Sequence, residues 1–579
     1  MGYSQFLITG DLVSVSAGEA PARHKSGTID TIRAQENPLR RQKFRSRVFL
    51  NHPWLRKDLE QNHLEELKAF GADYADEHLS KLNKILHIGQ LNLSAALPDE
   101  IEQFAADYAR RCAFMLDESE TTVKKFLSHL GIERKLDEPL KKNVSSLKWW
   151  RNFIYKRKTE SLAHVQRSVC NTYKSFSPYI DKESVKTHLK NKLKQRTYLE
   201  NTYIRNELGH TVSLAEVSDT SVSNPRIRRC ELMTELRGIS DWAEKNGDSG
   251  TFVTLTTPSR MHRCYPSGKR NPAWDNTHVK YAQSYLQKVW SRVRAKLARS
   301  GTKIYGMRVA EPHHDGCPHW HLLVFVQPHR LKEFKEIFTD YALRDSPDED
   351  GAREHRIEFL DNDKSKGNPI AYMAKYVSKN VDGFGLTEDD NGQEISEANN
   401  NIMAWARINN IRQFQFFGDP PRTIWRSLRK IEKPFESPEL EAIRQAADRG
   451  EFESYINLMG GMNVPRNKRP IQSISLPENC DHLTGELIGD YQSDQFIDYL
   501  QYQNLIIPVH FHTWKKISPP DLLTQLESTC APDAVGCMGA RLRRNQEASS
   551  WTRVNNCTVD KNPNHQIHNI KPPNTQELT

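Results

Sequence analysis

The order of strand-like and helix-like segments between residues 252 and 360 restricts the fold of this chain more than any other feature. Six segments show, in turn, the residue periodicity of a strand, a helix, two strands, a helix and a strand. They cover residues 252–256, 277–299, 303–309, 319–326, 330–343 and 355–360. This order predicts an α+β fold with a ferredoxin-like βαββαβ domain and an antiparallel sheet.

The rest of the chain predicts further elements around this domain. Helical spacing dominates residues 55–210, and the Ser/Thr-rich stretch 211–225 is typical of a linker. After the domain we expect a helix at 369–380, an acidic Asn-rich loop at 386–400, a strand at 411–417 and a helix at 423–430. The chain is thus divided into a flexible arm over 1–50, a helical basic region over 51–220, the α+β domain over 221–435, and a C-terminal region over 436–579 with a disordered tail.

Positive charge is concentrated in one part of the helical region. The whole chain carries 82 Lys and Arg against 73 Asp and Glu, a net charge of +9. Residues 141–200 alone hold 15 basic and 4 acidic residues, a net charge of +11. A basic track with aromatic residues can neutralise phosphates and stack unpaired bases, so we predict that Trp149, Trp150 and Arg151 contact DNA. The alternative is a solvated basic face above buried aromatic side chains.

The composition excludes several classes of protein. The sequence contains no apolar run near the roughly 18 residues that a membrane helix needs. The first residues lack the basic segment and the apolar stretch that are typical of a signal peptide. With 9 Cys in 579 residues, a disulfide framework is not expected. We therefore expect a protein of a reducing compartment without a membrane partner.

Two histidines on the predicted strand at 319–326 form a candidate metal site. Strand side chains alternate between the two faces, so His319 and His321 point to the same face. Glu311 ends the preceding strand, across a hairpin loop, and can place a carboxylate beside both imidazoles. Two histidines and one carboxylate leave open positions for substrate, as a catalytic ion requires. The alternative is a pair of half-exposed histidines without a ligand role.

Two tyrosines on the predicted helix at 369–380 form a candidate catalytic pair. Tyr372 and Tyr376 are four residues apart, which places both phenols on one helix face. Lys375 and Lys379 flank them and can hold a phosphate or lower the pKa of a phenol. A phenol can attack a phosphodiester, displace the 3′ oxygen and keep the 5′ phosphate as an ester. The alternative is an ordinary amphipathic helix with two tyrosines in the core.

Taken together, these segments resemble a known family. FVTLTTPSRMH at 252–262, RVAEPHHDGCPHWHLL at 308–323 and AYMAKYVSKN at 371–380 are similar to the three motifs of HUH-superfamily rolling-circle replication initiators. The similarity is closer to the replication gene A proteins of tailed double-stranded DNA phages and their prophages. It spans roughly residues 140–432, and segments 224–233 and 411–417 also resemble the family.

The resemblance implies a role for each matching residue. His319, His321 and Glu311 would hold Mg²⁺ or Mn²⁺, although the ligand set alone would equally accept Zn²⁺. Tyr372 and Tyr376 would be the nucleophiles, and Lys375 would contact the scissile phosphate. Thr254 and Thr256 would support the site. His313 and His314, in the hairpin loop, and Lys379 would contact DNA, although a role of the two histidines in loop conformation is an open alternative.

The resemblance also implies a function, which we state as an expectation. The α+β domain would be an HUH nickase that cuts one strand at a phage replication origin, in single-stranded or supercoiled DNA, and stays attached to the 5′ end. Rolling-circle replication would follow in the bacterial cytoplasm, with a host replicative helicase and polymerase, since the sequence has no Walker A pattern. The alternatives are a relaxase of a mobilisation system and a non-catalytic DNA-binding protein.

Overall fold

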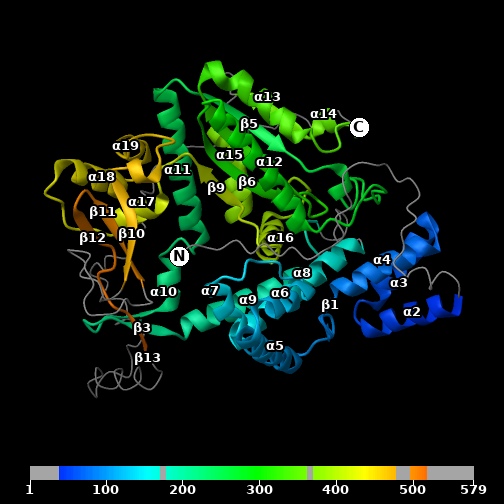
Figure 1. Cartoon of the computed structure of the whole chain (residues 1–579). Helices are drawn as coiled ribbons and strands as arrows, with labels where there is room; N and C mark the ends of the chain where they lie inside the picture. Colours follow the sequence, from blue (N-terminus) through cyan, green and yellow to red (C-terminus); the bar gives the residue numbers. More distant parts are fainter. Residues whose placement is uncertain (1–37, 170–177, 362–368, 478–495, 518–579) are drawn as a thin grey trace, which may run out of the picture. The chain divides into compact units, whose positions relative to one another are not determined.

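The computed structural model describes residues 38–169, 178–361, 369–477 and 496–517 (Figure 1). The chain forms two compact units, each built from two separate stretches of sequence. The first unit combines Met1–Leu193 with Gly247–Phe417, and the second combines Lys194–Asn246 with Gly418–Thr579. These limits differ from the four parts expected above, because long-range packing joins segments that are distant in the sequence.

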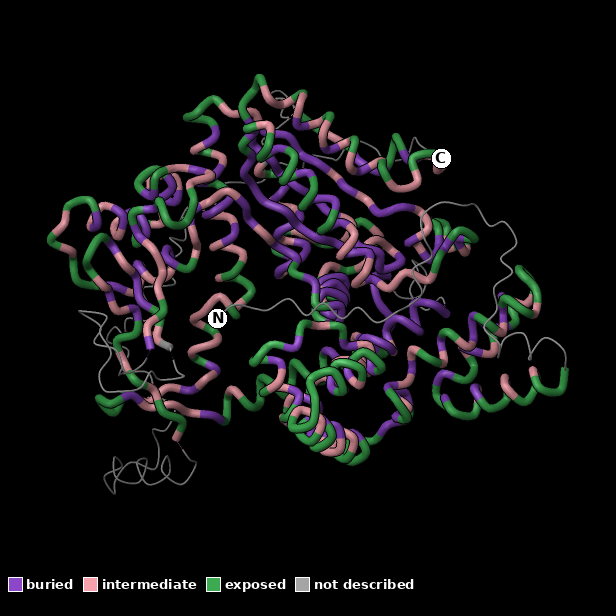
Figure 2. Tube along the Cα trace, viewed as in Figure 1, coloured by how far each residue is buried: buried purple, intermediate pink, exposed green. Residues whose placement is uncertain are grey.

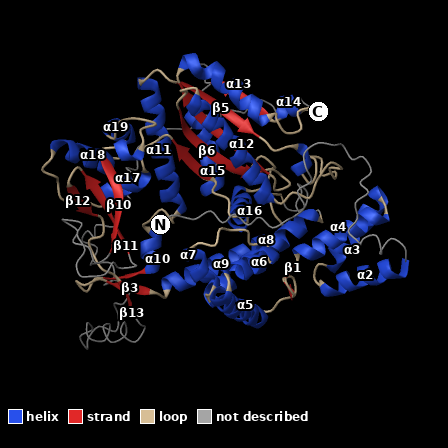
Figure 3. Cartoon of the chain, viewed as in Figure 1, coloured by secondary structure: helices blue, strands red, loops and turns tan. Residues whose placement is uncertain are grey.

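The central sheet of the first unit has five strands in the order β8-β5-β7-β6-β9, and all neighbours are antiparallel. Figure 3 shows the strands of the chain in red, with β5 and β6 of this sheet labelled. The strands are β5 (Ser249–Leu255), β6 (Ile304–Pro312), β7 (Pro318–Val326), β8 (Ile357–Asp361) and β9 (Phe414–Phe417). Each of the six periodic segments has the secondary structure predicted for it. The mixed α+β class with an antiparallel sheet is therefore confirmed.

Side-chain alternation gives the sheet two different faces. On one face, Val253 and Val324 belong to the main apolar core together with residues of α12 (Val279–Arg299) and α13 (Leu331–Ala342). On the other face, Phe252 of β5 contacts the tyrosines of α15 (Pro369–Val381). Figure 2 shows the strands of this sheet mostly as buried chain. The face toward α15 is the one that carries the candidate site.

One helix lies where a loop was expected. Residues 395–400 of the predicted loop at 386–400 are the first turns of α16 (Ile395–Ile408). Ala398, Ile402 and Trp405 give this helix a buried stripe, and Asn399 donates a hydrogen bond from Nδ2 to the Lys379 carbonyl at 3.0 Å. The run of asparagines concealed the helical period, because several of these polar side chains are buried.

The first unit also contains a helical region that precedes the sheet in sequence. Its elements are α2 (Pro38–Asn51), α3 (Arg56–Phe70), α4 (Ala72–Ile85), β1 (His87–Ile88), β2 (Leu91–Asn92), α5 (Pro98–Glu118), α6 (Glu120–His129), α7 (Glu138–Val144), α8 (Leu147–Ser168) and the first part of α9 (Lys182–Glu200). The short α14 (Ala352–His355) precedes β8. Residues 1–37 of the expected arm lie outside the described residues, but 38–50 form most of α2. Arg45 of α2 pairs with Asp76 of α4 at 2.6 Å, and Val48 is buried, so this helix packs on the fold.

The second unit is built from small sheets and short helices. Its helices are α10 (Leu214–Asp219), α11 (Pro225–Lys245), α17 (Arg422–Leu428), α18 (Pro438–Arg449) and α19 (Phe452–Leu458). Its strands are β3 (Tyr203–Arg205), β4 (Thr211–Ser213), β10 (Ile471–Pro477), β11 (Phe496–Tyr502), β12 (Leu505–Pro508) and β13 (Lys515–Ile517). The stretch expected to be a linker holds β4 and α10, because Ser213 and Glu216 form a capping box that starts a helix.

The predicted disordered tail lies outside the described residues. Within the described ranges, no helix is long and apolar enough to cross a membrane.

A buried arginine joins the helical region to the loop between β6 and β7. Arg167 of α8 donates from Nε to the Asp315 carbonyl at 2.8 Å and from Nη1 to the Thr277 carbonyl at 2.7 Å. Its Nη2 contacts the Asp315 carboxylate at 3.2 Å and the Met261 carbonyl at 2.9 Å. Asp315 itself is fully buried, and its pKa lies well below the usual value although burial opposes this, because His262 and Arg167 stabilise the carboxylate.

Replacing this arginine should destabilise the first unit strongly. Arg167→Ala leaves the Asp315 carboxylate without one of its buried partners, and we expect a loss of about 3–5 kcal/mol. Arg151→Ala serves as the control, since Arg151 makes a partly exposed pair with Glu102 at 3.1 Å and should cost less than about 1 kcal/mol. Chemical denaturation followed by circular dichroism measures both variants. Equal stability of the two variants would contradict the role assigned to Arg167.

Candidate metal and tyrosine site

Strand register brings the three predicted metal ligands together at the hairpin end of β6 and β7. Glu311 lies directly opposite His319 in the antiparallel pair, and His321 follows on the same face of β7. The two Nε2 atoms of His319 and His321 are 2.9 Å apart. Glu311 Oε2 lies 3.9 Å from Nε2 of His319 and 3.6 Å from Nε2 of His321. Among the residues that the structure describes, these three form the group whose donor atoms lie close enough together to hold a metal ion.

The chemistry of these donors fits a divalent ion. Burial lowers the pKa of His319 well below its usual value and lowers the pKa of His321 to about 3, so both imidazoles are neutral and can donate a lone pair. Adjacent ligands of an octahedral ion at about 2.1 Å are about 3.0 Å apart, close to the separation of the two Nε2 atoms. Burial also raises the pKa of Glu311, and Lys379 and Asn380 oppose this increase. A carboxylate with two imidazoles is a common set for such an ion.

Neighbouring side chains hold the three ligands in place. Asn380 of α15 donates from Nδ2 to Glu311 Oε1, and its Oδ1 accepts from Gln413 Nε2 at 3.0 Å. Thr254 Oγ1 lies 3.3 Å from Nδ1 of His321, the nitrogen that faces away from the other ligands. Such partners orient ligands and tune their affinity for a metal. Thr256 bonds to the His355 carbonyl at 2.7 Å and so supports the strand.

Of the two predicted tyrosines, Tyr376 lies beside the ligands and Tyr372 lies next to Tyr376. The ring of Tyr376 stacks on His321 with centroids 4.0 Å apart, and the rings of Tyr372 and Tyr376 are 5.6 Å apart. Phe252 of β5 packs against both tyrosines. Tyr376 is buried, whereas Tyr372 is 41% exposed. Burial, then the neighbouring Tyr372 and Glu311, raise the pKa of Tyr376 well above its usual value.

The two lysines of α15 are joined by one acidic residue. Asp390 Oδ1 lies 2.9 Å from Lys375 Nζ, and Asp390 Oδ2 lies 2.7 Å from Lys379 Nζ. Lys379 also lies 3.4 Å from Glu311 Oε2. Burial would lower the pKa of Lys379, but the neighbouring Glu311, Tyr179 and Asp390 raise it above its usual value. Burial would raise the pKa of Asp390, but the two lysines hold it below its usual value. A single carboxylate therefore spans the two cations beside the tyrosines.

The predicted DNA contacts in the hairpin have structural partners. The ring of His313 packs against that of His319 in a tilted arrangement with centroids 4.0 Å apart, and the backbone N–H of His313 donates to the Cys317 carbonyl at 2.7 Å. Nε2 of His314 lies 3.2 Å from the Cys264 carbonyl. These contacts favour the loop-conformation alternative, while DNA contact by His313 and His314 stays a prediction.

The structure corrects one of the three predicted contacts on α8, that of Trp150, while DNA contact by Trp149 and Arg151 stays a prediction. Trp150 is fully buried and donates from Nε1 to the Val144 carbonyl at 2.7 Å, so it belongs to the core and cannot stack on bases in this conformation. Trp149 is half-buried and stacks on Phe153 with centroids 5.4 Å apart. Arg151 pairs with Glu102. Helical spacing places the tryptophans toward α5 and α6. The number of basic and aromatic residues in a stretch of sequence does not show whether the aromatic side chains are buried in a core or exposed for stacking on bases.

Sequence reasoning missed Asn380, Gln413 and Asp390. Asn380 follows Tyr376 by four residues, so the spacing rule that paired the tyrosines would have placed it on the same helix face. Gln413 and Asp390 come from separate segments, and nothing in their local sequence marks them. The site thus has a part that local spacing predicts and a part that depends on packing.

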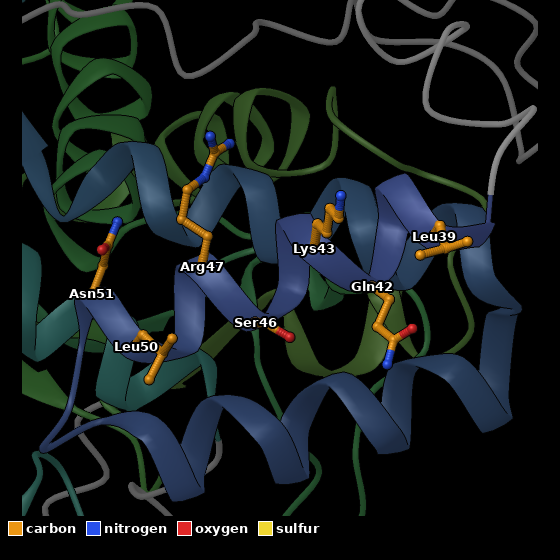
Figure 4. A pocket seen from close by; sticks show the side chains of 7 residues that line it. All are labelled: Leu39, Gln42, Lys43, Ser46, Arg47, Leu50 and Asn51. Carbon is orange, nitrogen blue, oxygen red and sulfur yellow. The ribbon is translucent and has the colours of Figure 1, made fainter.

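A hollow on the surface does not coincide with this site. It lies along one face of α2 and is lined by Leu39, Gln42, Lys43, Ser46, Arg47, Leu50 and Asn51 (Figure 4). All of these residues belong to a single helix, and none is a metal ligand or a tyrosine. The candidate site is therefore defined by its chemistry, not by the shape of a pocket.

Comparison with known proteins covers the part of the chain that holds this site. The family model of the bacteriophage replication gene A protein (GPA) matches residues 96–384, which include the ligands and both tyrosines. The chain belongs to the bacteriophage replication gene A protein family. The matched residues thus include α5 to α8, the strands β5 to β8 of the sheet, and α15.

Curated members of the family are similar over a large part of the chain. The replication gene A protein of Escherichia phage 186 is 38% identical over 348 residues, which cover 58% of this chain and 50% of that protein. A protein described as a probable replication endonuclease from a prophage-like region of Salmonella paratyphi A is 31% identical, covering 74% of this chain and 54% of its own length. One with the same description from Escherichia coli O6:H1 is 32% identical, with 72% and 52% covered.

The chain spans about half the length of these relatives. No solved structure matches it.

Proposed function

We propose that this chain is a site- and strand-specific DNA endonuclease that nicks a phage or prophage origin through a tyrosine–phosphate link and starts rolling-circle replication. The observation that carries the proposal is the tyrosine pair next to the ligand group of Glu311, His319 and His321, with Tyr376 against His321 and Tyr372 against Tyr376. The strand order β8-β5-β7-β6 supports a ferredoxin-like fold of the HUH type. The names of the relatives, replication gene A protein and replication endonuclease, support the same activity.

The chain's own residues can carry out the transesterification. The phenol oxygen of one tyrosine attacks the phosphorus and gives up its proton, and the bond from phosphorus to the 3′ oxygen breaks. The 3′ oxygen takes up a proton and becomes a free 3′ hydroxyl, while the 5′ phosphate stays on the tyrosine. The second tyrosine can later attack a regenerated site in the same way. Lys375 and Lys379 would hold the phosphate charge during both steps.

A divalent ion would complete this site. Glu311, His319 and His321 would hold Mg²⁺ or Mn²⁺, and the same donors also suit Zn²⁺. When bound, such an ion withdraws electrons from the phosphate and makes it easier to attack. Asn380 and Thr254 would keep the carboxylate and one imidazole oriented toward it.

Other functions predict different behaviour. A relaxase would share the nicking chemistry, but its nucleophile usually precedes the paired histidines in sequence, whereas α15 follows them. A non-catalytic DNA-binding protein would form no covalent product. We propose origin DNA as the substrate, a host helicase and polymerase as partners, and the bacterial cytoplasm as the place of action.

Capture of a covalent adduct tests the proposal. The chain is incubated with a pool of random single-stranded oligonucleotides and Mn²⁺ or Mg²⁺, denatured with detergent, and the DNA that stays attached is sequenced. We expect one recovered sequence motif, attached by its 5′ phosphate to a peptide of α15. Absence of an attached motif in every metal tested would overturn the proposal, and attachment to a residue outside α15 would overturn the assignment of the tyrosines.

The bridge formed by Asp390 leads to a prediction about DNA binding. DNA must displace this carboxylate before both lysines can contact a phosphate, at the cost of two ion pairs of about 0.2–1 kcal/mol each. We therefore expect Asp390→Asn to bind single-stranded DNA about three- to tenfold more tightly, measured by fluorescence anisotropy with chelator present to prevent cleavage. Glu388→Gln, at an exposed position of the same loop, removes the same charge and should have little effect. Weaker binding by Asp390→Asn would show that the aspartate positions the lysines instead.

A further inference from the structure

Helix α9 carries a row of lysines that the proposed nicking site does not use. Lys182, Lys186, Lys190 and Lys194 follow one another at intervals of four residues, and all four are exposed. Residues at this spacing lie on one face of a helix, about 6 Å apart along its axis, so the row extends over about 18 Å. The buried residues of α9, Ser184 and His188, lie on a different face. All four lysines of the row are thus exposed to solvent.

Little neutralises this row within the chain. Lys186 lies 3.5 Å from Glu183 on the same helix. Among the residues that the structure describes, Lys182, Lys190 and Lys194 have no acidic partner within ion-pair distance. Like charges four residues apart destabilise a free helix, so an anionic partner that relieves this repulsion would stabilise it.

The start of α9 is attached to the end of the sheet that holds the metal ligands. The backbone N–H of Tyr179, just before α9, donates to the His314 carbonyl in the β6–β7 hairpin at 3.1 Å. Tyr179 also donates from its hydroxyl to Asp389, the neighbour of Asp390. Asp181 then accepts from the Ser184 N–H at 2.7 Å and starts the helix. The first lysine of the row, Lys182, therefore lies only a few residues along the chain from Tyr179, which contacts the hairpin of the candidate site.

We infer that the lysine row of α9 binds the sugar–phosphate backbone of double-stranded DNA next to the nicking site. The four lysines offer charge alone, and proteins that hold single-stranded DNA combine charge with aromatic platforms for the bases. The aromatic residue that follows at the same spacing, Tyr198, already carries Lys516, whose Nζ lies 5.3 Å from the centroid of its ring. Contacts made by charge alone depend on phosphates and not on base sequence. The inference rests on the proposed function, because the position beside the site matters only if the site cuts DNA.

The chain offers a matched control row on α12. Lys288, Arg292, Lys296 and Arg299 are also exposed, lie on one face of that helix, and carry the same charge. α12 packs on the sheet face opposite α15. Arg299 precedes Ile304, the first residue of β6, whereas Glu311 lies near the last. The control row thus lies behind the other face of the sheet, and its last residue is next to the end of β6 that is distant from the ligands.

Two charge-matched variants test the inference. One replaces Lys182, Lys186, Lys190 and Lys194 by Gln, and the other replaces Lys288, Arg292, Lys296 and Arg299 by Gln. Binding of a labelled duplex of about 30 base pairs and arbitrary sequence is measured by anisotropy between about 50 and 200 mM salt. Circular dichroism and thermal unfolding confirm that both variants are folded.

The expected result is a change in salt dependence for the α9 variant alone. Loss of four phosphate contacts should reduce the slope of log affinity against log salt by about 3.6 and weaken binding at least about tenfold at the lowest salt. The α12 variant should change the slope by less than about 1. Equal effects of both variants, or an unchanged slope for the α9 variant, would overturn the inference.

Adduct formation on a short single-stranded oligonucleotide separates this inference from the proposed function. The α9 variant should form the adduct at the wild-type level, because this substrate does not reach a duplex surface. Suppose that neither the wild-type protein nor a variant forms an adduct, while the slopes of log affinity against log salt differ as expected. The proposed function then fails, and the lysine row still binds duplex DNA. An α9 variant that binds duplex normally but forms no adduct would overturn the inference.

Discussion

Replacing Tyr372 and Tyr376 together by Phe should abolish the covalent protein–DNA adduct, with a fall in adduct yield of at least about 10⁴-fold. Phenylalanine keeps both rings in place against Phe252 and His321, and so removes the two nucleophilic oxygens with little change in packing. Each single variant should still form some adduct, because the remaining phenol lies in the same site. The yield is measured by electrophoresis under denaturing conditions with end-labelled DNA.

A matched pair of substitutions controls for a general effect of losing tyrosine hydroxyls. Tyr155 and Tyr198 are exposed, and replacing both by Phe should leave the adduct yield unchanged. DNA binding by the Tyr372→Phe/Tyr376→Phe variant in the presence of chelator should also be close to wild type. An adduct that persists at the wild-type level in the double variant would show that another residue is the nucleophile.

Replacing the two histidine ligands should remove both metal binding and nicking. Polarisation of a phosphate by an ion is worth several kcal/mol, so we expect His319→Ala/His321→Ala to lose about 10³-fold or more in the rate of nicking. The loss of metal should be visible without activity, as the disappearance of tight Mn²⁺ binding measured by electron paramagnetic resonance. Chelation of the wild-type protein should have the same effect on nicking, and added Mn²⁺ should reverse it.

His314→Gln is the matched control for this change. His314 lies in the same hairpin but contacts the Cys264 carbonyl and none of the ligands, so Mn²⁺ binding should be retained. We chose the histidines over Glu311 because removing that carboxylate would also leave Lys379 with one fewer buried partner. Nicking that continues in chelator, or tight Mn²⁺ binding by the double-histidine variant, would disprove the metal site.

The central elements of the site could be predicted because they depend on short-range periodicity. His319 and His321 share a face because strand side chains repeat every two residues, and Tyr372 and Tyr376 share a face because a helix repeats every 3.6. Glu311 was found because a hairpin places the end of one strand beside the start of the next. Asn380 obeys the same helical rule, although the prediction did not use it.

Other features depend on contacts between distant segments, and sequence reasoning misplaced or missed them. The basic window at 141–200 contains both the buried Trp150 and the exposed lysines of α9, and its net charge does not distinguish them. Burial of Trp150 follows from the packing of α8 against α5 and α6. The asparagine-rich start of α16 has the composition of a loop, but its polar side chains find partners inside the fold and the segment is helical.

The sequence by itself determined the α+β class, the order of the strands and helices around the sheet, and the candidate ligands and nucleophiles. Only the tertiary structure decided that Asp390 bridges Lys375 and Lys379, that Gln413 supports Asn380, and that Arg167 reaches Asp315 across 148 positions of sequence. The physical reason is the range of the forces involved. Backbone geometry repeats over a few residues and leaves a local pattern, whereas the burial that pairs distant side chains arises only when the whole chain packs.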